Sequence, residues 1–96
     1  MAVVESEKTL ERKLAKKVEA LGGWSLKLLA VHISGLPDRI CLLPGGKVFF
    51  VEVKTTKQKP RKIQLVVHER LKKLGFPVYV VDTSEGIEEV LNQWDT

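Results

Sequence analysis

Two carboxylates and a lysine stand where two predicted strands meet, and their types suit metal-dependent chemistry. Asp38 follows a Gly-Leu-Pro sequence at the start of one strand, and Glu52 and Lys54 lie two residues apart at the end of the next strand. Side chains two positions apart on a strand point to the same side of the sheet. Glu52 and Lys54 therefore share a face, and Asp38 joins them if the hairpin between the strands has the matching register.

The length of the hairpin loop decides this register. A three-residue loop at 44–46 sets Asp38 opposite Glu52, whereas a two-residue loop sets it opposite Val53, on the other face. Directly opposed carboxylates destabilise a sheet unless a cation bridges them. Mg²⁺ suits such a pair, because it takes oxygen ligands from one or two carboxylates and keeps waters for a phosphate. Lys54 would then orient an attacking water or stabilise charge on a phosphoryl oxygen.

The size and composition of the chain predict one globular domain over residues 1–96. Hydrophobic residues make up 44% and charged residues 29% of the chain, which excludes disordered, fibrous and disulfide-stapled classes. One cysteine excludes a multi-cysteine zinc site. The N-terminal segment lacks the apolar run of a secretory signal. No stretch approaches the roughly 18 continuous apolar residues of a membrane span, so we expect an intracellular protein with no membrane partner.

Hydrophobic periodicity predicts the elements that position these residues. Apolar residues spaced by three and four predict a helix over residues 6–21, with Ser6 as its N-cap. Further helices are expected at 60–74 and 84–93, and strands at 24–32, 38–43, 47–54 and 78–82. Strands that are apolar on both faces must be covered on both sides. The order α-β-β-β-α-β-α therefore predicts an α/β fold with a mixed four-stranded sheet flanked by helices.

Two helix faces carry further expectations. In the first helix, Glu7 falls within the apolar face and Glu11 on its edge. A carboxylate in that position either reaches water through a frayed first turn or has a function. The helix over 60–74 is expected to place Leu65 on its outer side and to bury a face made of Ile63, Val66, Val67, Leu71 and Leu74.

Several sequence blocks, taken together, are more specific than a lone Glu-x-Lys, which is more often a polar patch at a strand end. They are Glu7-x-x-Leu10, Gly35-Leu36-Pro37-Asp38-Arg39, Leu43-Pro44-Gly45-Gly46, Glu52-Val53-Lys54, Lys59-Pro60-Arg61, Gln64 and His68-Glu69-Arg70-Leu71. Their order resembles the PD-(D/E)XK nuclease superfamily and, within it, the VRR-Nuc (virus-type replication-repair nuclease) family, especially its small stand-alone phage and bacterial members. The resemblance covers nearly the whole chain and implies a restriction-endonuclease-like core. The segment 30–34 departs from the arginine- and proline-bearing loop of that family.

The resemblance also implies roles for individual residues. A first-helix Glu completes the site, and Glu7 keeps the family's spacing, with Glu11 as the alternative. The implied metal is Mg²⁺ or Mn²⁺, and its ligands are Glu7, Asp38, Glu52 and the carbonyl of Val53. The implied catalytic residues are Glu7, Asp38, Glu52, Lys54 and Gln64. His32 and His68 lack metal-ligand spacing, and we expect each to be packed or solvated.

These implications predict a metal-dependent, structure-specific endonuclease that hydrolyses DNA phosphodiester bonds in the cytoplasm of a bacterial or phage-infected cell. Small family members are similar to junction-resolving enzymes, so the expected substrate is branched DNA such as a Holliday junction. Two cuts on opposed strands would need a homodimer. A net charge of +4 is a weak pointer to nucleic acid. A basic stretch is expected to contact phosphates without reading sequence, through Lys57, Lys59, Arg61 and Lys62.

Two alternatives stay open. One is a flap or single-strand nuclease, which would use the same metal centre on a different DNA structure. The other is a non-catalytic nucleic-acid-binding module whose carboxylates are structural. A divalent-metal-dependent cleavage assay separates the enzyme from the binding module.

Overall fold

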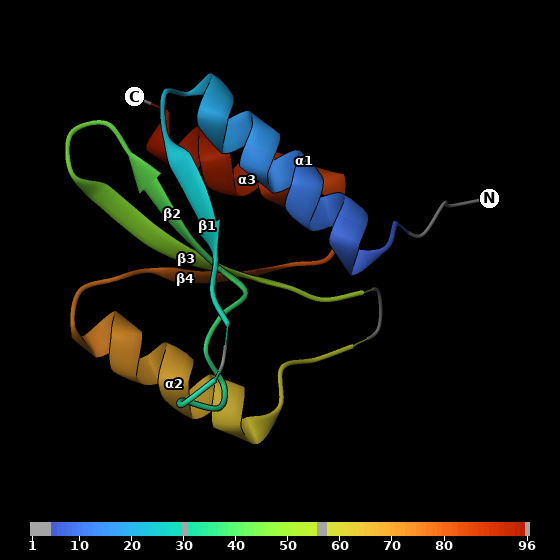
Figure 1. Cartoon of the computed structure of the whole chain (residues 1–96), viewed down its shortest axis with the longest axis vertical. Helices are drawn as coiled ribbons and strands as arrows, with labels where there is room; N and C mark the ends of the chain where they lie inside the picture. The colour runs from blue at the N-terminus through green and yellow to red at the C-terminus, as the bar shows by residue number, and fades with distance from the viewer. Residues whose placement is uncertain (1–4, 30, 56–57, 96) are drawn as a thin grey trace.

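A four-stranded sheet with helices on both faces makes up the fold (Figure 1). The computed structural model describes residues 5–29, 31–55 and 58–95. The elements are α1 (Glu7–Ala20), β1 (Trp24–Lys27), β2 (Arg39–Leu43), β3 (Lys47–Val53), α2 (Lys62–Lys73), β4 (Val78–Val81) and α3 (Ser84–Trp94). This confirms the predicted order and fold class. In the described part of the chain, no helix has the length and apolarity that a membrane crossing requires.

The sheet has the order β1-β2-β3-β4, with one parallel pair at its end. β1, β2 and β3 are antiparallel neighbours, and α2 connects β3 to the parallel strand β4. In the β2–β3 hairpin Arg39 pairs with Val51 and Leu43 with Lys47, so three residues form the loop. One step beyond Arg39, this register sets Asp38 opposite Glu52, which confirms the three-residue-loop prediction.

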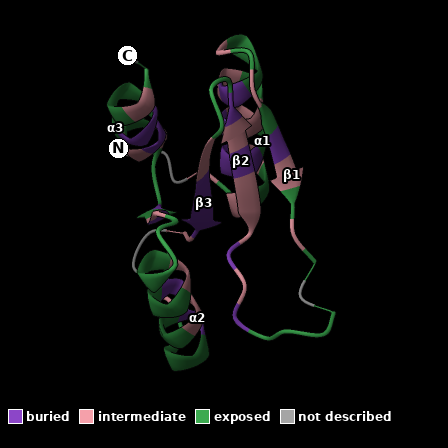
Figure 2. Cartoon of the chain, turned by 90° about the vertical axis from the view of Figure 1, so that its left-hand side faces the viewer, coloured by how far each residue is buried: buried purple, intermediate pink, exposed green. Residues whose placement is uncertain are grey.

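The hydrophobic core lies on the sheet face that α1 and α3 cover (Figures 1 and 2). Ser6 caps α1 as predicted, because its side chain accepts a hydrogen bond from the backbone N–H of Thr9. Trp94 of α3 stacks on Phe49, with the ring centroids 4.9 Å apart. The core residues are Leu10, Leu14 and Val18 of α1, Cys41, Leu43, Phe49, Val51, Val53 and Val81 of the sheet, and Ile87, Val90 and Leu91 of α3.

β1 is shorter than predicted, ending at Lys27 rather than at residue 32. Its partner strand explains the difference, because Lys27 pairs with Arg39, the first residue of β2. One further hydrogen bond, from the N–H of Leu28 to the carbonyl of Asp38 at 2.8 Å, extends the ladder. Beyond it the chain leaves the sheet in a loop, so the apolar residues that follow have no strand to pair with.

The predicted buried face of α2 is wrong in part. Val66 and Leu74 are 64% and 67% exposed, Ile63 is also exposed, and Val67 and Leu71 are half-buried. The helix instead buries the polar residues Gln64 and His68, one helical turn apart, and most of its surface is exposed (Figure 2). The reason is that α2 packs on β4 and the end of β3, where the buried carboxylate of Glu52 requires polar neighbours. Leu65 is exposed, as expected.

Candidate functional site

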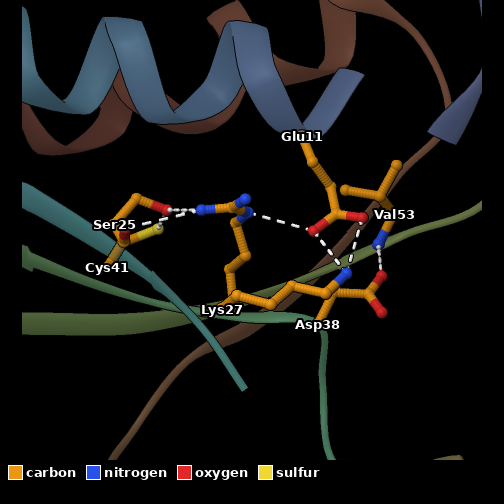
Figure 3. Close-up of polar contacts among 7 residues, drawn as sticks. Glu11, Ser25, Lys27, Asp38, Cys41 and Val53 are labelled. Carbon is orange, nitrogen blue, oxygen red and sulfur yellow. Dashed lines mark hydrogen bonds and ion pairs between the residues drawn. The ribbon is translucent and has the colours of Figure 1, made fainter. Parts of the chain in front are cut away.

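A tight approach of the 35–37 loop to α2 positions Asp38. Gly35 has a φ of +89°, and a Cβ there would lie 2.6 Å from the carbonyl oxygen of Ile63, so only glycine fits. Pro37, two residues later, is fully buried. Asp38 follows directly, and its Oδ2 accepts a hydrogen bond from the N–H of Val53 at 2.7 Å (Figure 3). The carboxylate is thereby fixed at the end of β3.

The two carboxylate oxygens of Glu52 have different surroundings. This residue is 1% exposed. Its Oε2 accepts a hydrogen bond from Gln64 Nε2 at 2.8 Å and lies 3.1 Å from Lys54 Nζ. Its Oε1 is buried with no hydrogen-bond partner among the described residues, and His68 Nε2, also unpartnered, lies 3.9 Å away. A buried carboxylate oxygen without a partner is costly, and it suits a ligand that the protein itself does not supply.

Burial and mutual repulsion make the ionised Asp38–Glu52 pair unfavourable. Burial raises the pKa of Glu52, and the negative charge of Asp38 raises it further, against the opposing effects of Lys54 and Gln64. Burial also raises the pKa of Asp38, partly offset by the hydrogen bond from Val53. A buried and a half-buried carboxylate facing each other are suitable ligands for a hard divalent cation. The residues of this site therefore fit the Mg²⁺ or Mn²⁺ that the resemblance implies.

This electrostatic cost predicts that Glu52→Gln stabilises the metal-free protein at neutral pH. Because the pKa of Glu52 is raised in the folded state, protonated Glu52 stabilises the fold fully at pH values below its unfolded-state pKa of about 4.3. This stabilisation is lost as the pH rises through the folded-state pKa. We expect Glu52→Gln in EDTA at pH 7.5 to raise the melting temperature by several degrees, since about 1 kcal/mol corresponds to roughly 4–8 °C in a small domain. The gain should vanish near pH 4.

Calorimetry on both proteins, with exposed Glu19→Gln as the matched control, measures this effect. Mn²⁺ should stabilise the wild type, because a ligand that binds the folded state raises its stability, and it should stabilise Glu52→Gln far less. A lower melting temperature for Glu52→Gln than for the wild type in EDTA at neutral pH would contradict this electrostatic account.

The two glutamates of α1 have different partners. Glu7 stands in the first turn, and its Oε2 accepts a hydrogen bond from the N–H of Thr55 at 3.1 Å, just beyond the end of β3. Glu11 is buried and is engaged by two cations, Lys27 and Arg39. Glu7 therefore lies beside the chain segment that carries Glu52, whereas the charge of Glu11 is already balanced.

The acidic residues do not form a complete three-ligand cluster. Within residues 5–29, 31–55 and 58–95, no group of three or more His, Cys, Asp and Glu side chains is arranged to hold a metal ion. The structure nevertheless brings together Asp38, Glu52, Lys54 and Gln64. It places Glu7 beside the backbone of Thr55, the residue after Lys54.

His68 is the site residue that sequence reasoning missed. It is buried beside Glu52, and burial followed by the charges of Lys72 and Lys54 lowers its pKa. Its position four residues after Gln64 puts both on one helix face, and this spacing is the signal that could have found it. Gln64 also accepts a hydrogen bond from the N–H of Arg61 at 2.8 Å, so it joins the start of α2 to Glu52.

Three of the four predicted DNA-contacting residues lie at the surface near this site. Lys59, Arg61 and Lys62 are exposed where the chain enters α2, as phosphate contacts require. Lys57 lies outside the described residues. His32 is exposed, in line with the expectation that it is solvated.

Comparisons with known proteins identify the family of the chain. No family model matches the chain. The chain is 39% identical over 79 residues to a protein named "Putative nuclease p44" of Acyrthosiphon pisum secondary endosymbiont phage 1, a match that covers 82% of this chain and 85% of the relative. A solved structure described as a VRR_NUC domain superposes with a TM-score of 0.85 at 36% identity, over 92% of this chain and 96% of the other. With sequence and backbone matched over most of each relative, the chain belongs to the VRR-Nuc nuclease family.

Proposed function

We propose that this protein is a Mg²⁺- or Mn²⁺-dependent endonuclease that hydrolyses DNA phosphodiester bonds. The observation that carries the proposal is the buried, unpartnered Oε1 of Glu52. The residue itself stands opposite Asp38 in the hairpin, and its other oxygen, Oε2, forms an ion pair with Lys54. Membership of a nuclease family supports the same chemistry. A structural carboxylate pair in a non-catalytic binding module would be expected to have all its buried oxygens satisfied, so this observation disfavours that alternative.

The site residues have distinct tasks in this mechanism. Asp38, Glu52 and the carbonyl of Val53 would hold the ion, with Glu7 completing the set. A bound divalent cation supplies an acidified water and neutralises charge on a phosphoryl oxygen. Gln64 donates a hydrogen bond to Oε2 of Glu52, and Lys54 forms an ion pair with the same oxygen. These contacts orient the carboxylate, and Oε1 has no donor among the described residues.

Lys54 is the residue placed to act on the reacting groups. Its ammonium lies at the mouth of the site, with 16% of the side chain exposed. From there it would orient the attacking water or stabilise the charge that develops on a phosphoryl oxygen. Lys57, Lys59, Arg61 and Lys62 would hold the flanking backbone without reading bases.

Branched DNA is the substrate that we propose for this enzyme, in the cytoplasm of a bacterial or phage-infected cell. A cleavage panel tests the activity and its preference. It compares a four-way junction, a flap, single-stranded DNA, linear duplex and RNA, each with Mg²⁺, Mn²⁺ or EDTA. We expect metal-dependent paired nicks in the junction and no cleavage in EDTA. Preferred cutting of flaps or single strands would favour the alternative nuclease. Absence of cleavage on every substrate would refute the enzyme.

We further propose that two copies act together as a symmetric homodimer. A four-way junction has approximate two-fold symmetry and needs two opposed cuts, and one chain carries one centre. Two-fold dimers are also the commonest closed assemblies. We place the dimer interface on α2, because a single copy leaves Val66 and Leu74 of this helix about two-thirds exposed. Phe76 and Val80 beside them are exposed as well.

Analytical ultracentrifugation at micromolar concentration tests the dimer. The wild type should sediment at twice the chain mass without DNA, and as two chains bound to one junction when junction DNA is added. Val66→Glu should shift it to the monomer, because burying an unpaired charge at an apolar interface costs several kcal/mol, whereas exposed Glu19→Gln on α1 should not. A wild type that remains monomeric in both conditions and still makes paired cuts would contradict the proposal.

A further inference from the structure

A second charged cluster lies between α1 and the β1–β2 edge of the sheet, on the face opposite α2. The cluster surrounds a cleft of about 420 Å³. The residues that line this cleft are Lys8, Glu11, Arg12, Ala15, Lys27 and Arg39. Four of these side chains are basic and one is acidic, so the cleft has a formal net charge of +3. Nothing in the metal site described above requires this concentration of positive charge.

Glu11 holds two of the cations in fixed positions. Both of its carboxylate oxygens lie 2.8 Å from Lys27 Nζ, and its Oε1 accepts a hydrogen bond from Arg39 Nε at 3.0 Å. Arg39 Nη1 also donates to the carbonyl and hydroxyl oxygens of Ser25, each at 3.4 Å (Figure 3). Ordering a lysine and an arginine before a ligand arrives reduces the entropy that binding costs.

The two ordered cations retain hydrogen-bonding capacity toward the cleft. An ammonium has three donors and a guanidinium has five. Among the described residues, Lys27 makes two hydrogen bonds, both to Glu11, and Arg39 makes its hydrogen bonds through Nε and Nη1. The third donor of Lys27 and the Nη2 group of Arg39 have no hydrogen-bond partner among these residues. Lys8 and Arg12, three residues before Glu11 and one after it in α1, add two exposed cations. Planar guanidinium and mobile ammonium groups together are well suited to a phosphate.

Backbone connections join this cleft to the metal site. Arg39 follows Asp38 in the chain, and Lys8 follows Glu7. Lys27 pairs with Arg39 in the sheet, and the next residue donates its N–H to the carbonyl of Asp38. The cleft and the Asp38 carboxylate therefore share one end of the sheet, and a single nucleic-acid strand crossing that end would meet both.

From this arrangement we infer that the cleft binds a backbone phosphate of the DNA substrate, at a nucleotide away from the bond that is cut. The inference rests on the proposed function and adds to it a second phosphate contact, on the opposite side of the metal site from the basic stretch that enters α2. Two anchored phosphates fix the direction of the strand across Asp38 and Glu52. The same geometry gives Glu11 the role of a positioning residue for Lys27 and Arg39.

DNA binding in EDTA tests the cleft independently of catalysis. Fluorescence anisotropy with a labelled four-way junction is measured over a range of salt concentrations for the wild type and for Lys8→Ala/Arg12→Ala. The matched control is Lys16→Ala/Arg70→Ala, which removes the same two residue types at exposed positions outside the cleft. Because each lost duplex phosphate contact lowers the salt slope by about 0.9, we expect a slope lower by about 1 to 2 and affinity about tenfold weaker in the cleft variant.

The outcomes of this experiment distinguish a failure of the phosphate-binding cleft from a failure of the proposed nuclease function. Equal slopes and affinities for the cleft variant and the control, in a wild type that binds and cuts DNA, would overturn the cleft and leave the proposed nuclease intact. Failure of the wild type to bind or cut any DNA would instead defeat the proposed function. Lys27→Met serves as a second cleft variant, and unchanged binding there would also count against the inference. A melting curve for each variant checks that the fold is retained.

Discussion

Glu52→Gln and Asp38→Asn should each reduce metal-dependent DNA cleavage by about 10³-fold or more. The reason is that both substitutions keep the shape of the side chain and remove the charge that a divalent cation requires. Metal catalysis supplies several kcal/mol of transition-state stabilisation, and each 1.36 kcal/mol is tenfold in rate. Single-turnover cleavage of a labelled junction, with enzyme in excess, measures the chemical step without product release.

Binding of the same junction in EDTA provides the necessary comparison. We expect the affinity of both variants to equal or slightly exceed that of the wild type, because a negative charge near the phosphates has been removed. Glu19→Gln, at an exposed position of α1, is the matched control and should cut at the wild-type rate. Cleavage by either site variant at more than a tenth of the wild-type rate would refute the assignment of these carboxylates.

Lys54→Met should lose cleavage by about 10²–10³-fold, the usual cost of removing one donor that stabilises developing charge. Methionine keeps the length of the side chain and removes its ammonium, which lies 3.1 Å from Glu52 Oε2. The variant should nevertheless bind Mn²⁺, because Asp38 and Glu52 remain. Isothermal titration with Mn²⁺ and the single-turnover assay, run side by side, separate these two effects.

Lys16→Met on the exposed surface of α1 controls for the loss of one positive charge and should behave as the wild type. If Lys54→Met lost Mn²⁺ binding together with cleavage, the lysine would be a support for the metal site and not a group that acts on the substrate. If it cut normally, Lys54 would have no part in the reaction.

The opposition of Asp38 and Glu52 was predictable because a local feature determines it. Three residues between β2 and β3 set the register, and Gly35 and Pro37 mark the turn that leads into Asp38. Similarly, the amphipathic pattern and the cap of α1 follow from residues within the helix. Features of this kind depend only on residues that are close in sequence, so the sequence alone is enough to predict them.

The surroundings of α2 and of Glu11 were not predictable in the same way. Periodicity identifies an apolar stripe on α2, but it does not say whether another element lies opposite. The helix in fact turns Gln64 and His68 inward toward a carboxylate from a different strand. The cations that engage Glu11 come from β1 and β2, and the end of β1 depends on where β2 begins. Such features arise from non-local packing.

A crystal soaked in Mn²⁺ tests the central claim most directly, because the anomalous signal locates the ion without reference to activity. We predict one strong peak, or two adjacent peaks, within coordination distance of Asp38 and of Oε1 of Glu52. The same soak of Glu52→Gln should show the peak lost or greatly weakened. A Mn²⁺ peak elsewhere on the molecule, with none between Asp38 and Glu52, would contradict the metal centre on which the proposed nuclease depends.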